Sequence, residues 1–202
     1  MYITPEQQDA LSEMINIGFG RAAATLSVLV GQRVLLEAPR VELLSIPELR
    51  SVMIPLSSGS EIIVHQIFKG SLSGNTLLFM DIQSATILVD LLSGGSGVSH
   101  DLTDYDREAM LEIGNILLNS YIGSFANLLN TQIAFAVPNL CDETLHDMLD
   151  HFELAEGQLS YTLLVKTEFH FTNRSIGGYV VLIIGINSLE ELFRAIERVS
   201  NH

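Results

Sequence analysis

The sequence predicts an α/β (α+β) fold built by internal duplication, and three observations lead to this prediction. A long helical pattern is followed by several β-like runs of branched and aromatic residues, and this order occurs twice along the chain. Each half then closes with an apolar run that leads directly into a further helical pattern. Polar residues also recur at one spacing in both long helices. Together these features indicate a repeat.

The first repeat, about residues 4–92, begins with a helix. Thr4 supplies a capping hydroxyl, Pro5 stands at the first helical position and Gln7 at the third, which is typical of a helix start. We expect this helix to continue to about Val30 and to end before Gly31. Four β-like runs and a closing helix follow, at residues 34–44, 51–56, 61–68, 76–80 and 84–92.

The second repeat, about residues 103–199, begins in the same way. Thr103 precedes the acidic residues Asp104 and Asp106, and helical periodicity then continues towards Leu129. The later β-like runs and the closing helix are expected at residues 132–137, 161–171, 179–184 and 189–199. The segment 142–156 has no evident counterpart in the first repeat, and its apolar spacing predicts an inserted amphipathic helix.

The two repeats are joined by the Gly/Ser stretch 93–97, which predicts a flexible linker. We nevertheless expect one pseudo-twofold domain over residues 1–202. Each half has too few strands to cover its own helix, and pairing the halves buries both apolar faces.

Composition excludes several classes of partner and chemistry. The formal net charge is −14 and the ten Lys and Arg residues are not clustered, so neither nucleic acid nor an anionic membrane surface is an expected partner. No apolar stretch is long enough to span a bilayer and no signal segment is recognisable, which favours a cytoplasmic protein. Motifs of classical hydrolases, kinases and zinc proteases are absent. His146 and His151 lie five positions apart, on different sides of a helix, so we expect no metal site there.

Two polar triplets carry the candidate chemistry. Each has a carboxylate, a glutamate and an asparagine at i, i+4 and i+7, which places three side chains on one helix face. The triplets are Asp9, Glu13 and Asn16 in the first helix and Glu108, Glu112 and Asn115 in the second. After 22 further residues each is followed by a proline, Pro39 and Pro138. One copy alone would be read as a solvated stripe, but the recurrence at a fixed offset favours a function.

This pattern resembles the signature of the CheC, CheX and FliY phosphatase family: an acidic residue or Ser, then Glu, Asn and Pro at the spacings described above. The stretches EMINIGFGRAAATLS and EIGNILLNSYIGS resemble its two active-site helices, and two motifs in one chain are characteristic of CheC. Glu108 departs from the Ser or Asp usual at that position. The resemblance implies an antiparallel sheet with two exposed active-site helices related by pseudo-twofold symmetry.

The resemblance also implies an activity, that of a hydrolase acting on the aspartyl phosphate of a CheY-type chemotaxis response regulator. By family analogy Asn16 and Asn115 orient the attacking water, while Glu13 and Glu112 pair with a lysine of the regulator. The protein would need no cofactor of its own, since the regulator supplies Mg²⁺.

The other motif positions, Asp9, Pro39, Glu108 and Pro138, are expected to be accessory, with the prolines shaping the backbone. The alternative function is that of a non-catalytic adaptor in the chemotaxis or flagellar switch system. Such an adaptor could bind a CheD-type deamidase through the helix predicted at residues 84–92, although that helix's apolar residues are expected to be core. Two intact motifs favour the enzyme.

Overall fold

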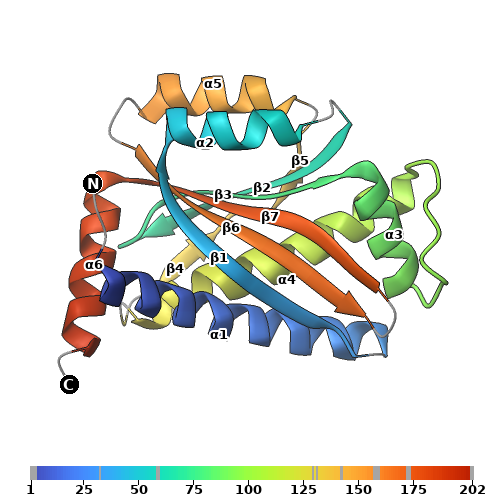
Figure 1. Cartoon of the computed structure of the whole chain (residues 1–202), viewed down its shortest axis with the longest axis horizontal. Coiled ribbons are helices and arrows are strands. Elements are labelled where there is room, and N and C mark those ends of the chain that lie inside the picture. The colour runs from blue at the N-terminus through green and yellow to red at the C-terminus, as the bar shows by residue number, and fades with distance from the viewer. Residues whose placement is uncertain are drawn as a thin grey trace.

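An antiparallel sheet of seven strands forms the centre of the molecule (Figure 1). The computed structural model describes residues 4–31, 33–57, 60–128, 130, 132–141, 143–156, 160–171 and 174–200. The sheet has the order β1-β6-β7-β3-β2-β4, and β5 also pairs with β2. The strands are β1 (Leu35–Ser45), β2 (Glu61–Gly70), β3 (Gly74–Asp81), β4 (Ile133–Phe135), β5 (Asn139–Leu140), β6 (Ser160–Phe171) and β7 (Arg174–Gly185).

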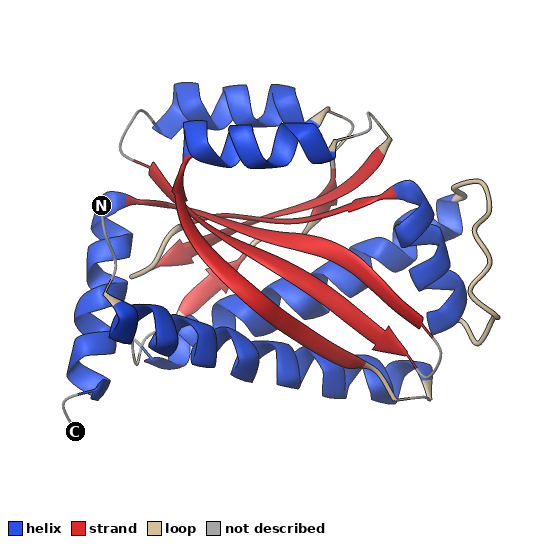
Figure 2. Ribbon diagram, viewed as in Figure 1, coloured by secondary structure: helices blue, strands red, loops and turns tan. Residues whose placement is uncertain are grey.

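Helices cover both faces of this sheet (Figure 2). The long helices α1 and α4 lie below it in the view of Figures 1 and 2, α2 and α5 lie above it, and α3 and α6 lie at its two ends. The helices are α1 (Pro5–Val30), α2 (Ile46–Met53), a 3-10 turn (Ile54–Leu56), α3 (Ile82–Leu92), α4 (Asp104–Leu128), α5 (Leu145–Glu156) and α6 (Ile186–Ser200). None of the described helices has the length and apolarity needed to traverse a bilayer.

The order of elements repeats, as the sequence predicts. Helices α1, α2 and α3 correspond to α4, α5 and α6, while β1, β2 and β3 correspond to β4/β5, β6 and β7. Because β3 pairs with β7 at the centre, exchanging the repeats reproduces the strand order of the sheet. The predicted α/β fold with a pseudo-twofold antiparallel sheet is therefore confirmed.

Alternating side chains of the inner strands build two apolar cores. On β2, Val64 contributes to the core shared with α1 and α4, whereas its neighbour Ile63 contributes to the core shared with α2 and α5. On β3, Leu78 and Leu77 divide in the same way. This period-2 alternation explains why both faces of the sheet require a helical layer.

Two predictions for the upper layer are wrong. Residues 51–56 were expected to form a strand but belong to α2 and the 3-10 turn that follows it. The start of α2 is fixed by a capping box: the Glu48 backbone N–H donates to Ser45 Oγ, and the Ser45 backbone N–H donates to Glu48 Oε2. Helix α5 was correctly predicted as a helix, but it is no insertion, because α2 is its counterpart.

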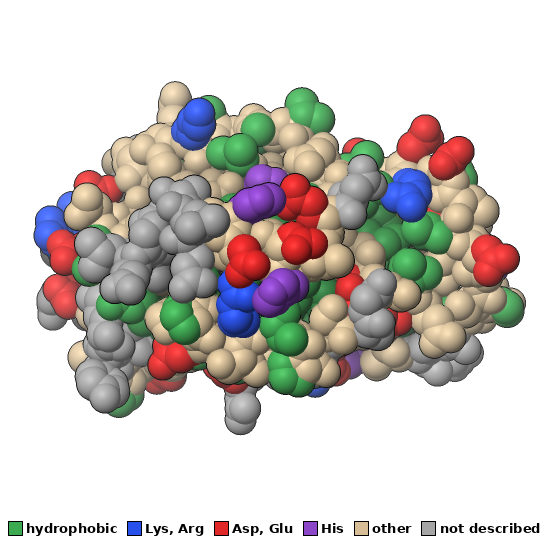
Figure 3. Space-filling model, turned by 90° about the horizontal axis from the view of Figure 1, so that it is seen from above, with side chains coloured by type: hydrophobic (Ala, Val, Ile, Leu, Met, Phe, Trp, Pro, Cys, Tyr) green, Lys and Arg blue, Asp and Glu red, His purple; other side chains and the backbone are tan. Residues whose placement is uncertain are grey.

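The outer face of α2 and α5 carries a cluster of charged and histidine side chains (Figure 3). On this face Arg50 pairs with Asp150, and a nitrogen of His146 lies 3.6 Å from the other Asp150 carboxylate oxygen. His151 pairs separately with Glu143 at 3.0 Å. The two histidines thus have different partners, and the described part of the chain brings together no group of three or more His, Cys, Asp and Glu residues suited to a metal.

Candidate active site

Helix α1 separates its residues into a buried face and an exposed face. Its buried residues include Leu11, Ile15 and Phe19, none of which is accessible to solvent. The first polar triplet lies on the opposite side, and all three of its side chains are exposed: Asp9, Glu13 and Asn16. The sequence therefore places this triplet where a second protein could contact it.

Both ends of α1 are fixed. Thr4 Oγ1 accepts a hydrogen bond from the Gln7 backbone N–H, and the Gln7 side-chain oxygen accepts one from the Thr4 backbone N–H. The Gln8 side chain donates to the carbonyl oxygen of Val41 at 2.7 Å, which ties the helix to β1. At the other end Gly31 has φ 65°, the left-handed conformation that glycine adopts without strain. The triplet therefore stands on a well-anchored element.

Helices α1 and α4 pack closely where Gly18 faces α4. A Cβ atom at Gly18 would lie 2.8 Å from the Ser120 carbonyl oxygen and 3.2 Å from the Tyr121 Cα. Beside this contact the rings of Phe19 and Tyr121 pack with their centroids 6.0 Å apart. The close approach requires a residue without a side chain at position 18, and it fixes the two motif-bearing helices against one another.

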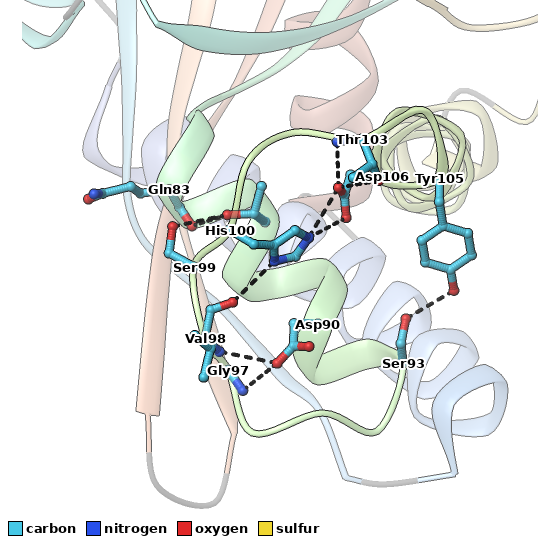
Figure 4. A network of polar contacts seen from close by, with 11 residues as sticks. Gln83, Asp90, Ser93, Gly97, Val98, Ser99, His100, Thr103, Tyr105 and Asp106 are labelled. Atoms are coloured by element: carbon cyan, nitrogen blue, oxygen red, sulfur yellow. Dashed lines mark hydrogen bonds and ion pairs between the residues drawn. The ribbon is translucent and has the colours of Figure 1, made fainter.

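The start of α4 is held by a network around the buried carboxylate of Asp106 (Figure 4). Asp106 accepts hydrogen bonds from the Thr103 backbone N–H at 2.8 Å and from the Thr103 hydroxyl at 2.6 Å. His100 Nε2 lies 3.1 Å from both carboxylate oxygens. Burial opposes ionisation of Asp106, but the bonds from Thr103 and His100 outweigh it and lower its pKa.

The same network raises the pKa of His100. Its Nδ1 lies 3.2 Å from the Val98 carbonyl oxygen, and this bond, together with the ion pair to Asp106, favours the protonated ring. The protonated imidazolium can donate from both ring nitrogens at once, one to the carbonyl and one to the carboxylate. The pair therefore links the connecting segment to the first turn of α4.

The segment between the repeats is hydrogen-bonded to α3, contrary to the prediction of a flexible linker. The Asp90 carboxylate accepts from the backbone N–H groups of Gly97, at 2.7 Å, and Val98, at 3.1 Å (Figure 4). The Ser93 and Tyr105 hydroxyls lie 3.0 Å apart and connect the segment to α4. Gly94 and Gly97 have positive φ, so the glycines here supply turn geometry.

The second triplet, on α4, resembles the first in position but differs in its surroundings. Glu108 and Glu112 are exposed, whereas Asn115 is half-buried. The side-chain N–H of Asn119, one turn further on, donates to Asn115 Oδ1 at 2.7 Å. Sequence reasoning did not single out this contact, although an asparagine four residues after another on a helix is a usable signal.

The two motif prolines lie at equivalent irregularities in the two edges of the sheet. In β1, two residues, Pro39 among them, lie opposite Thr167 alone, which is a β-bulge. Between β4 and β5, three residues, the last of them Pro138, lie opposite Gln66 and Ile67 of β2. Proline lacks a backbone N–H, and an edge bulge is a position where none is required.

An open groove of about 490 Å³ lies beside the second triplet, between the end of α1 and the middle of α4. Its lining is largely apolar and includes the motif residue Glu112: Ala24, Thr25, Val28, Leu29, Glu112 and Ile116. Val28 is 85% exposed and Leu29 61% exposed. A second groove, of about 460 Å³, runs along the β2–β3 hairpin and the start of α6 and contains no motif residue.

Each motif combines a carboxamide with a carboxylate one helical turn away. A carboxamide both accepts and donates hydrogen bonds, and a carboxylate one turn away can pair with a cation on a partner. Each triplet is brought together on one helix face, while the prolines lie in the sheet edges. The helix suggested for an adaptor, α3, has Leu88 and Val89 buried, so these residues are core as predicted.

Two curated relatives cover much of the chain, whereas no protein-family model matches it. The CheY-P phosphatase CheC of Bacillus subtilis is 26% identical over 205 residues, which cover 96% of this chain and 95% of that protein. The flagellar motor switch phosphatase FliY of Bacillus subtilis is 27% identical over 136 residues, or 66% of this chain and 35% of that protein.

Solved structures show the same fold. Thermotoga maritima FliY superposes with a TM-score of 0.80 at 24% identity and covers 98% of this chain and 99% of its own. The FliM middle domain of H. pylori gives 0.66 at 12% identity, covering 96% and 99%. CheX, from a Borrelia burgdorferi CheX-CheY-BeF3-Mg complex, gives 0.52 at 15% identity, covering 84% and 99%.

The relatives, the shared fold and the duplicated motif agree. The relative named CheC matches nearly the whole chain and FliY about two thirds of it, and FliY and CheX structures share its architecture. The chain is therefore similar in sequence to the CheY-P phosphatase CheC and the switch phosphatase FliY, and it shares the fold of the FliY and CheX structures.

Proposed function

We propose that this protein is a phosphatase that hydrolyses the aspartyl phosphate of a CheY-type response regulator. In this reaction water attacks phosphorus, the bond between phosphorus and the aspartyl oxygen breaks, and the products are a free aspartate and inorganic phosphate. The observation that carries the proposal is the placement of a Glu-x-x-Asn motif on each of two anchored helices, α1 and α4, with both glutamates exposed.

The asparagines act by positioning. When the regulator docks, Asn16 or Asn115 enters its active site, and the carboxamide oxygen accepts from the attacking water and holds it in line with phosphorus. Charge on the transferring phosphoryl group is neutralised by the Mg²⁺ and the lysine of the regulator itself. Positioning of this kind is a large part of catalysis in phosphoryl transfer, where little covalent chemistry is left to the protein.

The glutamates dock the regulator. Glu13 and Glu112 each lie three residues before the asparagine of their motif, about one helical turn away on the same face. Their exposed carboxylates can pair with the ammonium group of the regulator's lysine. One contact then aligns the helix so that the asparagine reaches the phosphoryl group.

The shape of the surface supports a folded protein as substrate. The triplets stand on exposed helix faces, and Glu112 also lines the open groove that Val28 and Leu29 make apolar. An exposed apolar patch beside a charged group is typical of a protein interface. The complex of CheX with CheY, in which CheX has this fold, supports a CheY-type partner.

The fold does not decide between an enzyme and a structural protein, because the FliM middle domain shares it. The site favours the enzyme. Each asparagine has a glutamate one helical turn away, which is an arrangement suited to positioning water. Asn16 recurs as Asn115 at the same offset of 99 residues that relates the two glutamates, and this recurrence argues against an incidental polar stripe.

The activity is tested by following phosphate release from a steadily phosphorylated CheY-type regulator, with and without this protein. We expect a protein-dependent increase in the rate. Replacing Glu13 and Glu112 together by Ala should raise the KM for the phosphorylated regulator about tenfold or more, since each carboxylate loses its charge-assisted contact. The matched control is Glu191→Ala, which removes an exposed glutamate from α6.

Two results would count against this proposal. Absence of any rate increase with every CheY-type regulator tried would refute the activity. An unchanged KM with a lowered kcat in the double glutamate variant would refute the docking role and leave the activity standing.

A further inference from the structure

The two Glu-x-x-Asn sites differ at the position one turn beyond the asparagine. On α4 this position is Asn119, whose side-chain N–H donates to Asn115 Oδ1 at 2.7 Å. On α1 the corresponding position is Gly20, which has no side chain. Among the described residues, Asn16 has no hydrogen bond from its carboxamide to another group. A neighbouring side chain therefore holds the asparagine of the second motif, whereas no side chain holds the asparagine of the first.

The side chain of Asn119 lowers the stability of the folded protein. Its Oδ1 is buried and has no hydrogen-bond partner among the described residues. A buried oxygen without a partner destabilises the folded state, and alanine would remove it while favouring the helix. A residue that costs stability in this way is expected at a functional site more than in a structural one.

We infer that Asn119 is a positioning residue that holds the Asn115 carboxamide ready for water, so that the two sites turn over at unequal rates. The inference rests on the proposed phosphatase function. The bond from Asn119 occupies one lone pair of Asn115 Oδ1 and leaves the second lone pair and both N–H groups for water and the phosphoryl oxygens. Asn115 thus keeps its capacity to accept from the attacking water.

The two sites should therefore differ in kcat and not in their affinity for the regulator. Asn16 is exposed, so it must be ordered each time a regulator docks, whereas half-buried Asn115 is held beforehand. Ordering one side chain corresponds to about two- to tenfold in rate. The docking glutamates, Glu13 and Glu112, are both exposed, and nothing in this contact changes them.

The first arm of the test isolates the α4 site with the Asn16→Ala variant. Adding Asn119→Ala to it should lower kcat about two- to tenfold and leave the KM for the phosphorylated regulator unchanged. The free energy of unfolding should stay level or rise, because the buried unpaired oxygen is gone. Unchanged kcat would overturn the inference, and so would a fall in kcat matched by a loss of stability, which would indicate a structural role.

The second arm transfers the contact to the α1 site, isolated with Asn115→Ala. A Cβ at Gly20 would have no heavy atom within 4 Å, so an asparagine fits there. Gly20→Asn should raise kcat by about the factor that Asn119→Ala removes from the other site. Gly20→Ala is the matched control, since it changes the helix backbone without supplying an amide. Equal effects of Asn and Ala at this position would contradict the inference.

A third arm needs no regulator and separates this inference from the proposed function. Nuclear magnetic resonance relaxation of the side-chain amides should show Asn115 more ordered than Asn16, and Asn119→Ala should release Asn115 to the mobility of Asn16. Equal mobility in the wild-type protein would overturn the positioning role. If no regulator responds to the wild-type protein, the proposed function fails and this arm alone decides the structural claim.

Discussion

At the scale of single residues, Gly18 shows how one small side chain fixes the site. Its backbone lies so close to α4 that an added Cβ would meet backbone atoms of Ser120 and Tyr121. These atoms belong to a helix and cannot move aside independently, as the end of a flexible side chain could. The close packing of α1 against α4 therefore depends on Gly18, which has no side chain that could take part in a reaction.

Gly18→Ala should destabilise the protein by about 1–2 kcal/mol, because overpacking outweighs the higher helix propensity of alanine. The matched control is Gly20→Ala on the same helix, where an added Cβ meets nothing within 4 Å. It should stabilise the protein by about 0.5–1 kcal/mol. Chemical denaturation of both variants measures the difference, and equal effects would mean that the helices do not approach closely at Gly18.

Tyr121→Phe should increase the free energy of unfolding by about 1–2 kcal/mol. The Tyr121 side chain is fully buried and its hydroxyl has no hydrogen-bond partner among the described residues. Burial also raises the pKa of the phenol, so the group stays protonated. Removing the hydroxyl removes an unpaired polar atom and keeps the ring contacts with Phe19 and Phe125. A loss of stability in denaturation would show that the hydroxyl has a partner.

Individual residues of the site differ in how far the sequence predicts them. The spacing of Glu13 and Asn16, repeated at Glu112 and Asn115, follows from helix geometry and needs no tertiary information. The sequence does not predict the role of Asn119 in the same way, because that role depends on burial of its side-chain oxygen in the folded protein. Helical periodicity shows which residues share a helix face, but it does not show which polar atoms are buried away from solvent.

At the scale of elements, the first turn of α4 depends on protonation of His100. The folded protein raises the pKa of His100 and lowers that of Asp106. A raised histidine pKa contributes stability that is fully present below the unfolded value, about 6.5, and is lost as pH rises through the folded value. The lowered pKa of Asp106 contributes stability that is lost only in acid. The pair is therefore strongest in mildly acidic solution.

The free energy of unfolding of the wild-type protein should fall more steeply between about pH 6 and 8 than that of His100→Gln, which cannot titrate there. Chemical denaturation at several pH values measures both slopes. Asp106→Asn, which removes the carboxylate that His100 Nε2 contacts, should flatten the slope in the same way. Parallel curves for the wild-type protein and His100→Gln would contradict the proposed ion pair.

The elements also show why one prediction failed. The starts of α1 and α4 carry capping residues followed by long periodic runs, so both could be predicted. Helix α2 has a comparable start, with Ser45, Pro47 and Glu48, but it is only eight residues long and rich in branched side chains. Short apolar runs are ambiguous between strand and helix. Packing against α5 and the sheet favours the helix over a strand, and the local sequence does not show that packing.

At the scale of the whole molecule, duplication explains both the fold and the site. Because β3 and β7 pair at the centre, each repeat completes the sheet of the other, and the two motif helices come to lie on one face of it. The sequence shows the duplication, but the pairing of β1 with β6 and of β2 with β4 depends on contacts between distant segments. Pro39 lies in β1 and Pro138 lies between β4 and β5, so the two prolines occupy equivalent places at the two edges of the sheet.

Phosphate release from a phosphorylated CheY-type regulator in the presence of the double variant Asn16→Ala/Asn115→Ala shows directly whether the two asparagines carry the activity. The variant should fold normally, because Asn16 is exposed, Asn115 is only half-buried and alanine favours a helix, and it should lose all stimulation. Asn127→Ala, which removes an exposed asparagine of α4 outside the motif, should retain it. Full stimulation by the double variant would contradict the account.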